Sequence, residues 1–201
     1  MKILLIPTIR EIYKNQFEYS VDIRLINFFT KIFKNSEVDI YHSSIKKNYD
    51  LVVLAGGNSS ITKNGADKIR YKLNNLIFNF FLKRKIKIIG ICHGAQFIAK
   101  KYGFKLRKKL NHTELHKVNF TIQNSKFKLI VNSFHNETIQ YKNSNMINIF
   151  GLAEDNTVEA YHIENKKILG IMWHPERFTR IRSFDKKLIK EFYATNSIMC
   201  R

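Results

Sequence analysis

The chain has 201 residues, of which 44% are hydrophobic and 25% are charged, a composition typical of a folded protein rather than a disordered one. Two cysteines cannot form a disulfide framework, and no run reaches the roughly 20 apolar residues that a membrane-spanning helix needs. The net charge of +19 favours an anionic partner. We expect one domain over residues 1–201. Because the apolar run at the start is too short for a signal peptide, we expect a cytoplasmic protein.

In the first half of the chain, predicted strands and helices alternate. Short apolar runs predict strands near 2–7, 38–41, 51–54 and 86–90, and longer runs between them predict helices near 20–34 and 65–84. Short alternating runs in 104–162 indicate antiparallel strands, and 183–199 is typical of a closing helix. The expected fold class is α/β, a three-layer sandwich with a central, mostly parallel sheet flanked by helices, plus a small antiparallel sheet.

A sharp turn between a strand and a helix carries Cys92. Residues 85–90 are typical of a buried strand, and residues 93–102 predict a helix. Gly90 and Gly94 allow the strand and the helix to approach closely, and we expect the sulfur to be exposed there. The positive end of the helix dipole favours the thiolate. On its own, a buried structural cysteine is the simpler interpretation.

A second strand, residues 168–173, leads into His174-Pro175-Glu176. Pro175 favours an extended conformation for His174, and in extended backbone positions 174 and 176 point the same way. Glu176 can then hold the His174 ring in one tautomer while the other ring nitrogen faces the Cys92 thiol. A nucleophile, its base and an orienting carboxylate form a catalytic triad, which favours a cysteine hydrolase or an acyl-transfer enzyme.

Two glycines follow the strand predicted at 51–54. Gly56-Gly57 alone indicates only a turn. An acyl-transfer site, however, needs two N–H donors for the oxyanion that develops on the reacting carbonyl. We expect these donors to be the N–H groups of Gly57 and of His93, the residue after the nucleophile.

These segments resemble the class I glutamine amidotransferase superfamily, and specifically its γ-glutamyl hydrolase branch. The matching runs occur in the family's order: Gly56-Gly57, Gly90–Gln96, Asn132–His135 and Gly170–Glu176. The resemblance implies a γ-glutamyl thioester on Cys92, and we expect no cofactor. It also implies substrate contacts from Gly56, Asn58, Gln96, Asn132, Ser133, Phe134 and His135.

Two departures from the family pattern affect the expected substrate rather than the chemistry. Met172 stands where the family often has Gln, and Asn58-Ser59-Ser60 stands where an acidic residue often follows the glycines.

Other candidate residues carry less specific signals. The polar segment 18–24 follows the first strand, at a position where loops line the site in open α/β sheets. Tyr19 and Arg24 could therefore contact the distal part of a substrate, although capping and surface contacts are the simpler interpretation. His112 and His116 have a helical metal-ligand spacing. Their region is typical of a strand and lacks a third ligand, so no metal site is predicted.

The basic charge has two interpretations. Its clusters at 83–85 and 107–109 could form a rim that attracts a nucleotide or a sugar phosphate. Alternatively, the many Lys, Ile and Asn residues reflect only a low-GC coding bias. No helix-turn-helix, zinc-finger or RNA-binding motif accompanies the charge.

Three functions remain open from the sequence. The resemblance favours hydrolysis of a small γ-glutamyl amide, nucleotide-linked and anionic, to glutamate and an amidate in capsular polysaccharide modification. The second is a glutaminase subunit that supplies ammonia to a synthase partner. The third is a non-enzymatic, basic nucleic-acid binder, against which the intact Cys92, His174 and Glu176 argue. Neither a nucleic acid nor a membrane is the expected partner.

Overall fold

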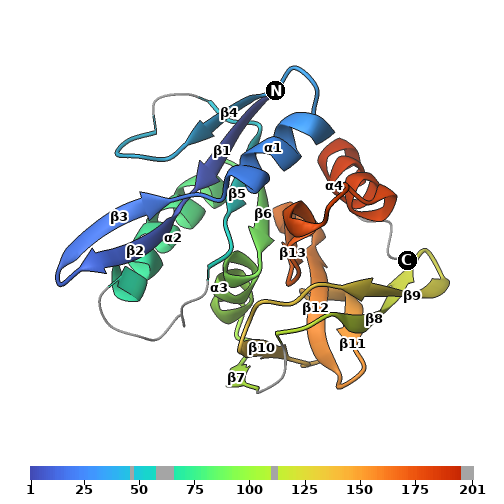
Figure 1. Cartoon of the computed structure of the whole chain (residues 1–201). Coiled ribbons are helices and arrows are strands. Elements are labelled where there is room, and N and C mark those ends of the chain that lie inside the picture. Colours follow the sequence, from blue (N-terminus) through green and yellow to red (C-terminus); the bar gives the residue numbers. More distant parts are fainter. Residues whose placement is uncertain (46–47, 58–65, 110–112, 196–201) are drawn as a thin grey trace.

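The computed structural model describes residues 1–45, 48–57, 66–109 and 113–195 (Figure 1). Its middle layer is a sheet of 11 strands in this described part. One half of the sheet is parallel, with neighbouring strands in the order β4 (Glu37–Ile40), β1 (Lys2–Ile6), β5 (Leu51–Leu54), β6 (Lys87–Ile91) and β13 (Ile168–Ile171).

The other half of the sheet is antiparallel and continues from β13. It contains β12 (Thr157–Ile163), β11 (Asn148–Ala153), β8 (His116–Ile122) and β9 (Ser125–Val131) in that order, and β10 (Glu137–Gln140) pairs with both β12 and β7 (Leu106–Lys108). The prediction of antiparallel strands in this part of the chain is confirmed. These strands extend the central sheet rather than forming a separate one.

The small separate sheet is a hairpin that the sequence pattern did not predict. It consists of β2 (Thr8–Tyr13) and β3 (Gln16–Ser20), joined by a turn in which Asn15 has a φ of 62°. Most residues of both strands are exposed or only partly buried. A strand without one buried face lacks the alternation of apolar and polar residues by which strands are recognised.

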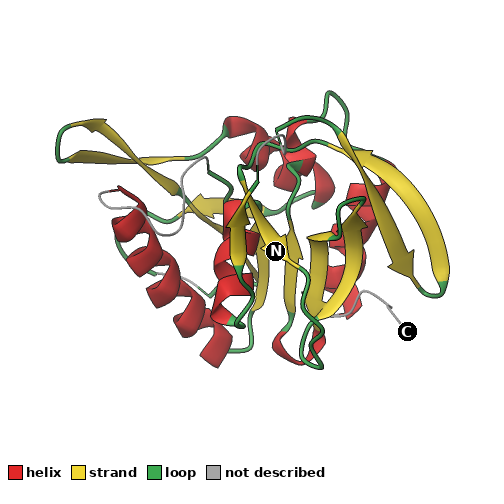
Figure 2. Ribbon diagram, turned by 90° about the horizontal axis from the view of Figure 1, so that it is seen from below, coloured by secondary structure: helices red, strands yellow, loops and turns green. Residues whose placement is uncertain are grey.

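Helices cover both faces of the central sheet (Figure 2). One face carries α1 (Ile23–Ile32) and α4 (Ser183–Thr195), and the other carries α2 (Ala66–Lys83) and α3 (His93–Lys101). Short 3₁₀ helices cover Glu164–Lys166 and Pro175–Arg177. The α/β fold class is confirmed. None of the helices in the described ranges is long and apolar enough to cross a membrane.

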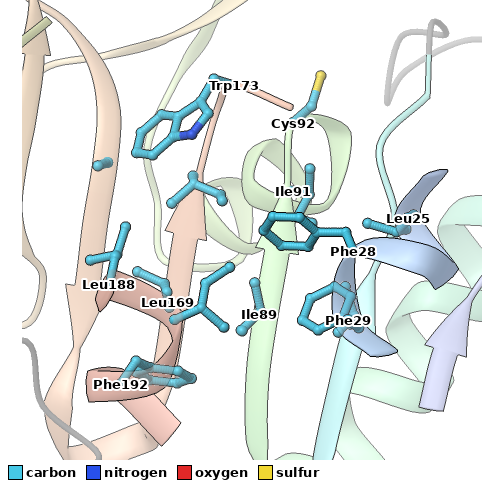
Figure 3. Close-up of a cluster of buried hydrophobic side chains, with 14 of the residues drawn as sticks. Leu25, Phe28, Phe29, Ile89, Ile91, Cys92, Leu169, Trp173, Leu188 and Phe192 are labelled. Carbon is cyan, nitrogen blue, oxygen red and sulfur yellow. The ribbon is translucent and has the colours of Figure 1, made fainter. Parts of the chain in front are cut away.

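The alternating direction of side chains along the buried strands explains why helices cover both faces of the sheet. In β1, Ile3 and Leu5 pack in the cluster that contains α1, whereas Leu4 and Ile6 pack in the cluster that contains α2 and α3. Successive side chains of a strand point to opposite faces, so a strand covered on both faces is apolar throughout. Figure 3 shows the first cluster, built from Leu25, Phe28, Phe29, Ile89, Ile91, Leu169, Leu188 and Phe192.

Candidate active site

Three neighbouring parallel strands deliver the candidate residues to one edge of the sheet. Gly56 lies just after β5, Cys92 after β6 and His174 after β13. In open α/β sheets the loops at the carboxyl ends of the strands border a crevice in which ligands bind. The fold therefore brings together three segments that are far apart in the sequence.

Cys92 occupies a strained turn between β6 and α3. Its φ of 49° and ψ of −105° lie outside the regions that L-residues favour, which costs about 1–3 kcal/mol and is typical of functional sites. The Cys92 N–H donates a 2.8 Å hydrogen bond to the carbonyl of Ile171 in β13. This bond ties the turn to the strand that leads to His174.

The glycines on either side of Cys92 are required by close packing, as the sequence predicted. A Cβ on Gly94 would lie 2.2 Å from the carbonyl oxygen of Leu54, and one on Gly90 would lie 2.7 Å from the backbone nitrogen of Ala95. Both distances are far below a normal van der Waals contact. Larger residues would push α3 away from β5 and β6.

The expectation of an exposed Cys92 sulfur is wrong, since the residue is only 1% exposed. It lies at the end of the cluster formed by α1, α4 and the sheet. Figure 3 shows the sulfur at the margin of that cluster, directed away from the aromatic rings. The surrounding strand ends exclude water, which strengthens electrostatic interactions at the thiol.

The His174 ring lies between Glu176 and Cys92. Its Nδ1 is 2.6 Å from Glu176 Oε1, and the backbone of His174 is extended, as predicted. Residues 175–177 then form a 3₁₀ turn rather than continuing the extended backbone. Burial alone would lower the pKa of His174. Attraction to Cys92, and then to Glu176, outweighs burial and raises this pKa to about 9, so the ring is an imidazolium at neutral pH.

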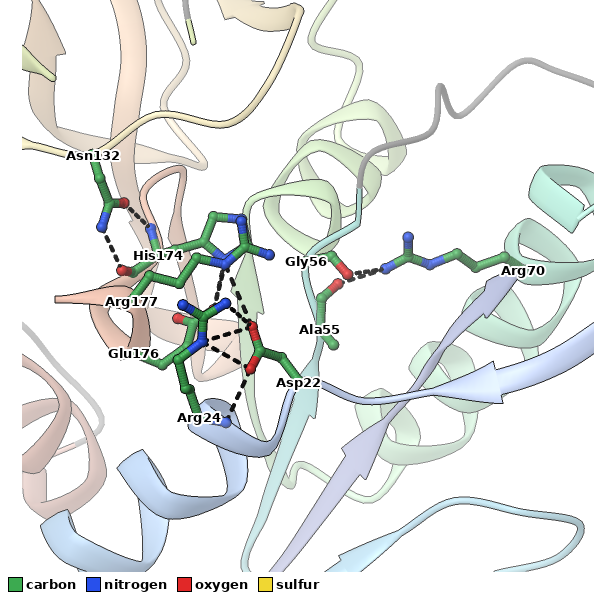
Figure 4. A network of polar contacts seen from close by, with 9 residues as sticks. All are labelled: Asp22, Arg24, Ala55, Gly56, Arg70, Asn132, His174, Glu176 and Arg177. Carbon is green, nitrogen blue, oxygen red and sulfur yellow. Dashed lines mark hydrogen bonds and ion pairs between the residues drawn. The ribbon is translucent and has the colours of Figure 1, made fainter. Parts of the chain in front are cut away.

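Asn132 holds the backbone of His174 (Figure 4). Its side-chain oxygen accepts a 2.8 Å hydrogen bond from the His174 N–H, and its amide nitrogen donates a 2.8 Å bond to the His174 carbonyl. The resemblance implied that Asn132 contacts the substrate. In the structure both ends of its amide are occupied by His174, so its observed contacts position the imidazole.

Both glycines after β5 border charged side chains. A Cβ on Gly56 would lie 2.3 Å from His174 Cε1, and a Cβ on Gly57 would lie 2.1 Å from Arg70 Nη1. Gly56 thus lies against the imidazole, and Gly57 lies against a buried arginine that the sequence did not single out. No short motif marks Arg70, which is one basic residue of α2 among several.

His93 is the first residue of α3, where backbone N–H groups have no partner within the helix. Its ring is buried, and burial together with the Arg70 charge holds the pKa of His93 well below its usual range. Because the His93 ring is neutral, the backbone N–H is the group of this residue that is suited to stabilise an oxyanion.

The remaining residues implied by the resemblance differ in their surroundings. Gln96 is buried and donates a 2.7 Å bond from Nε2 to the carbonyl of Glu137. Phe134 is 41% exposed, and its ring lies edge-on to that of His174 with centroids 5.6 Å apart. Ser133 is buried, as is His135. Asn58 lies outside the described residues.

His135 belongs to a second buried cluster, on the antiparallel side of the site. Its Nε2 is 3.8 Å from Glu159 Oε1, and Nε2 of His116 is 3.4 Å from the same oxygen. Burial opposes the positive charge of His116, but the Glu159 carboxylate raises its pKa overall. His112 is outside the described residues, and within them no group of three or more His, Cys, Asp or Glu side chains could hold a metal ion.

A cavity of about 950 Å³ opens beside His174, Gly56 and Gly57. Its outer side is formed by the hairpin β2–β3, the start of α1 and the segment after His174. We call its charged side chains the outer wall: Arg10, Glu11, Asp22, Arg24 and Arg177. Of these, the sequence pattern indicated only Arg24, because the hairpin that completes the wall was not predicted.

Arg24 and Tyr19 were both expected to contact the distal part of the substrate, but only Arg24 lies at the cavity. Arg24 lines the cavity and forms a two-pronged ion pair with Asp22, whose pKa the Arg24 hydrogen bond lowers. Asp22 also caps α1 by accepting the Arg24 N–H, so the capping interpretation applies as well. Tyr19 is not among the residues that line the cavity, and its ring instead packs edge-on against Tyr41.

The chain matches a known protein family over most of its length. The family model described as glutamine amidotransferase class-I matches residues 10–195. A γ-glutamyl-CDP-amidate hydrolase of Campylobacter jejuni is 34% identical over 172 residues, which are 85% of this chain and 82% of that protein.

Two further proteins are similar to this chain, one in sequence and one in fold. One component of the glutamine-hydrolyzing GMP synthase of Picrophilus torridus is 31% identical over 141 residues, 66% of this chain and 74% of that protein. Among solved structures, a glutamine amidotransferase from Thermotoga maritima superposes with a TM-score of 0.65 and 19% identity, covering 99% of this chain and 88% of that one. The latter likeness shows the shared fold.

Proposed function

The chain belongs to the class I glutamine amidotransferase family, and from that premise we propose that it hydrolyses the amide bond of a γ-glutamyl compound. The observation that carries the proposal is the position of the His174 ring, which binds Glu176 through Nδ1 and whose pKa the Cys92 sulfur raises. A thiolate beside an imidazolium pairs a nucleophile with the acid that its leaving group needs.

In the first half of the reaction, the Cys92 thiolate attacks the γ-carbonyl carbon and the π electrons of that carbonyl move to its oxygen. The N–H groups of Gly57 and His93 stabilise the resulting oxyanion. When the oxyanion collapses, the C–N bond breaks and protonated His174 gives its proton to the leaving nitrogen. The product of this half is a γ-glutamyl thioester on Cys92.

In the second half, neutral His174 takes a proton from water while the water oxygen attacks the thioester carbon. The C–S bond then breaks, glutamate leaves, and the thiolate and the imidazolium are restored. Glu176 keeps the ring in one orientation throughout. Asn132 supports the same orientation through the backbone of His174.

For the substrate we propose γ-glutamyl-CDP-amidate, giving glutamate and the CDP-linked amidate, in capsular polysaccharide modification. The similarity to the Campylobacter jejuni hydrolase supports this choice. The cavity beside His174, about 950 Å³ in volume, lies within the range of roughly 300–1,000 Å³ typical of ligand pockets. Guanidinium groups such as those of Arg10, Arg24 and Arg177 bind phosphate oxygens in a fork geometry.

The direct test is glutamate release by the purified chain from L-glutamine, from small γ-glutamyl amides and from γ-glutamyl-CDP-amidate. We expect rapid release from the nucleotide-linked compound, little from glutamine, and none from the Cys92→Ala variant with any substrate. Turnover of no γ-glutamyl compound by the wild type would refute the proposal.

A second candidate function is a glutaminase subunit that supplies ammonia to a synthase partner. The similarity to the GMP synthase component of Picrophilus torridus favours it. This function predicts that glutamine is the best substrate and that its turnover rises when a partner is added. The substrate panel therefore separates the two candidates by the ratio of glutamate release from glutamine and from the nucleotide-linked compound.

A further inference from the structure

Arg70 is a fully buried arginine next to the candidate active site. It lies in α2 and is 0% exposed. Its Nη2 donates hydrogen bonds to the carbonyl oxygens of Ala55 (2.6 Å) and Gly56 (3.0 Å), whereas its Nε and Nη1 have no hydrogen-bond partner among the residues that the structure describes. Burying a charge with two unused donors destabilises a fold. A buried guanidinium beside the candidate active site therefore calls for an explanation other than stability.

The bond from Arg70 to the Gly56 carbonyl restrains the peptide between Gly56 and Gly57, and the bond to the Ala55 carbonyl restrains the peptide before it. The described residues contain no cis peptide bond, and in a trans peptide the N–H points opposite to the carbonyl of the same plane. Since the Gly56 carbonyl points at Arg70, the Gly57 N–H must point away from it. Figure 4 shows Arg70 and His174 on opposite sides of Gly56, so this N–H faces the side of His174.

Without such a restraint, a Gly-Gly peptide is free to rotate. Glycine adopts both left-handed and right-handed conformations at little cost, and a rotated peptide would present the Gly56 carbonyl oxygen, rather than the Gly57 N–H, to the reacting group. A carbonyl dipole in that position repels a developing oxyanion instead of stabilising it. The orientation of this one peptide therefore decides whether the oxyanion has one donor or two.

We propose that Arg70 is a positioning residue that holds the Gly56–Gly57 peptide with the Gly57 N–H turned toward the reacting carbonyl. The inference rests on the proposed function, because it assigns Arg70 a part in forming the oxyanion site. The contact between Arg70 Nη1 and Gly57, where a Cβ would lie only 2.1 Å from the guanidinium, leaves no room for a side chain at Gly57. The guanidinium and the glycine pair thus form one packed unit.

Arg70 carries its positive charge at neutral pH. Burial lowers its pKa to about 10, and the attraction of Cys92 and Asp67 limits this fall. The guanidinium is therefore cationic at neutral pH, and hydrogen bonds from a charged donor to a carbonyl are stronger than those from a neutral one.

The test compares two reactions of the same Cys92 sulfur. Iodoacetamide alkylates a thiolate by displacing iodide at a CH₂ group, and no oxyanion forms. p-Nitrophenyl acetate acylates the thiolate through a tetrahedral oxyanion, then releases p-nitrophenolate. Both rates are measured at Cys92 by mass spectrometry of its peptide, because Cys200 is a second thiol. Neither reagent depends on which γ-glutamyl compound is the substrate.

The variants are Arg70→Met, which keeps the apolar stem without donors, and Arg70→Lys, which keeps the charge. Lys72→Met is the matched control, because it removes the same charge from an exposed position of the same helix. We expect Arg70→Met to lower the acylation rate by about 10²-fold, the effect of losing one oxyanion donor, with the alkylation rate unchanged. Arg70→Lys should be intermediate, and Lys72→Met should match the wild type.

Equal acylation rates in Arg70→Met and the wild type would overturn the inference, as would a parallel loss of both reactions. Thermal unfolding of each variant reports its fold. If Arg70→Met does not fold, the ratio of the two rates in Arg70→Lys decides the question, and a ratio equal to that of the wild type overturns the inference. A wild type that reacts with neither reagent refutes the proposed function itself, and with it the role of Arg70.

Discussion

The candidate reaction centre and the outer wall of the cavity differ in how firmly their side chains are held. Cys92 and His174 are each 1% exposed and Glu176 is 7% exposed. In the outer wall the Arg24 side chain is 56% exposed, and those of Asp22 and Arg177 are 24% and 20% exposed. The buried group is fixed by packing, whereas the wall depends on ion pairs that water and salt weaken.

This difference indicates that the two regions have different roles in the reaction. Rigid, desolvated groups suit bond breaking, because their geometry and electrostatics do not have to reorganise during the reaction. Exposed charges on a hairpin and a helix start suit the selection of the leaving group, because they can adjust to it. Substitutions in the first region should therefore change kcat, and substitutions in the second should change KM for one class of substrate.

The largest expected effect is the loss of turnover in Cys92→Ala. We expect glutamate release to fall by at least about 10⁴-fold, as in other enzymes that lose their nucleophile. The change removes one sulfur atom from a buried site, so the thermal midpoint should remain close to that of the wild type. Substantial turnover by this variant would contradict the assignment of Cys92.

The next effect is expected for Glu176→Gln, which keeps the shape of the side chain and removes its charge. With the pKa of His174 at about 9, the protonated ring is present at neutral pH and is lost as pH rises through that value. The wild-type rate should therefore decline on the alkaline side near pH 9. Because Glu176 helps to raise this pKa, the decline should begin at lower pH in Glu176→Gln.

The rate of Glu176→Gln at neutral pH should also fall by about 10²- to 10⁴-fold, since the ring is no longer held in one tautomer. A pH–rate profile of kcat for both proteins measures the two effects together. Glu154→Gln, at an exposed turn position, serves as the control for the loss of one carboxylate. An unshifted alkaline limb in Glu176→Gln would disprove the electrostatic role of this residue.

A smaller effect is expected for Asn132→Ala. The substitution leaves the N–H and the carbonyl of buried His174 without their side-chain partners, which should destabilise the fold by about 1–3 kcal/mol. The freed imidazole should lower kcat on the order of tenfold, because small displacements of a catalytic group reduce the rate. Urea unfolding and steady-state kinetics, compared with the exposed control Asn136→Ala, measure both. No change in kcat would mean that packing alone holds His174.

The smallest effect concerns the outer wall. Replacing Arg10 by Met should raise KM for γ-glutamyl-CDP-amidate by about tenfold, the change expected from roughly 1.4 kcal/mol of binding energy, with kcat unchanged. A γ-glutamyl amide with a small neutral leaving group should show no change. Lys14→Met, an exposed residue of the same hairpin that does not line the cavity, is the control. Equal effects on both substrates would show that Arg10 does not select the leaving group.

Much of the fold follows from local patterns. The apolar runs that became β1, β5 and β6 are buried on both faces, and such strands are apolar at every position. The helix expected near 20–34 starts later, at Ile23, because Asp22 caps it. The hairpin β2–β3 was missed, since its exposed strands follow neither periodicity.

The sequence by itself determined the order of the buried parallel strands along the chain, the tight turn at Cys92 and the spacing of His174 and Glu176, because these depend on neighbouring residues and on backbone preferences. Only the tertiary structure decided that Asn132 clamps His174, that Arg70 lies behind Gly57 and that Cys92 is buried. Those contacts join residues from separate elements. Their geometry depends on how strands are ordered in the sheet and on how helices pack over it, which no local pattern encodes.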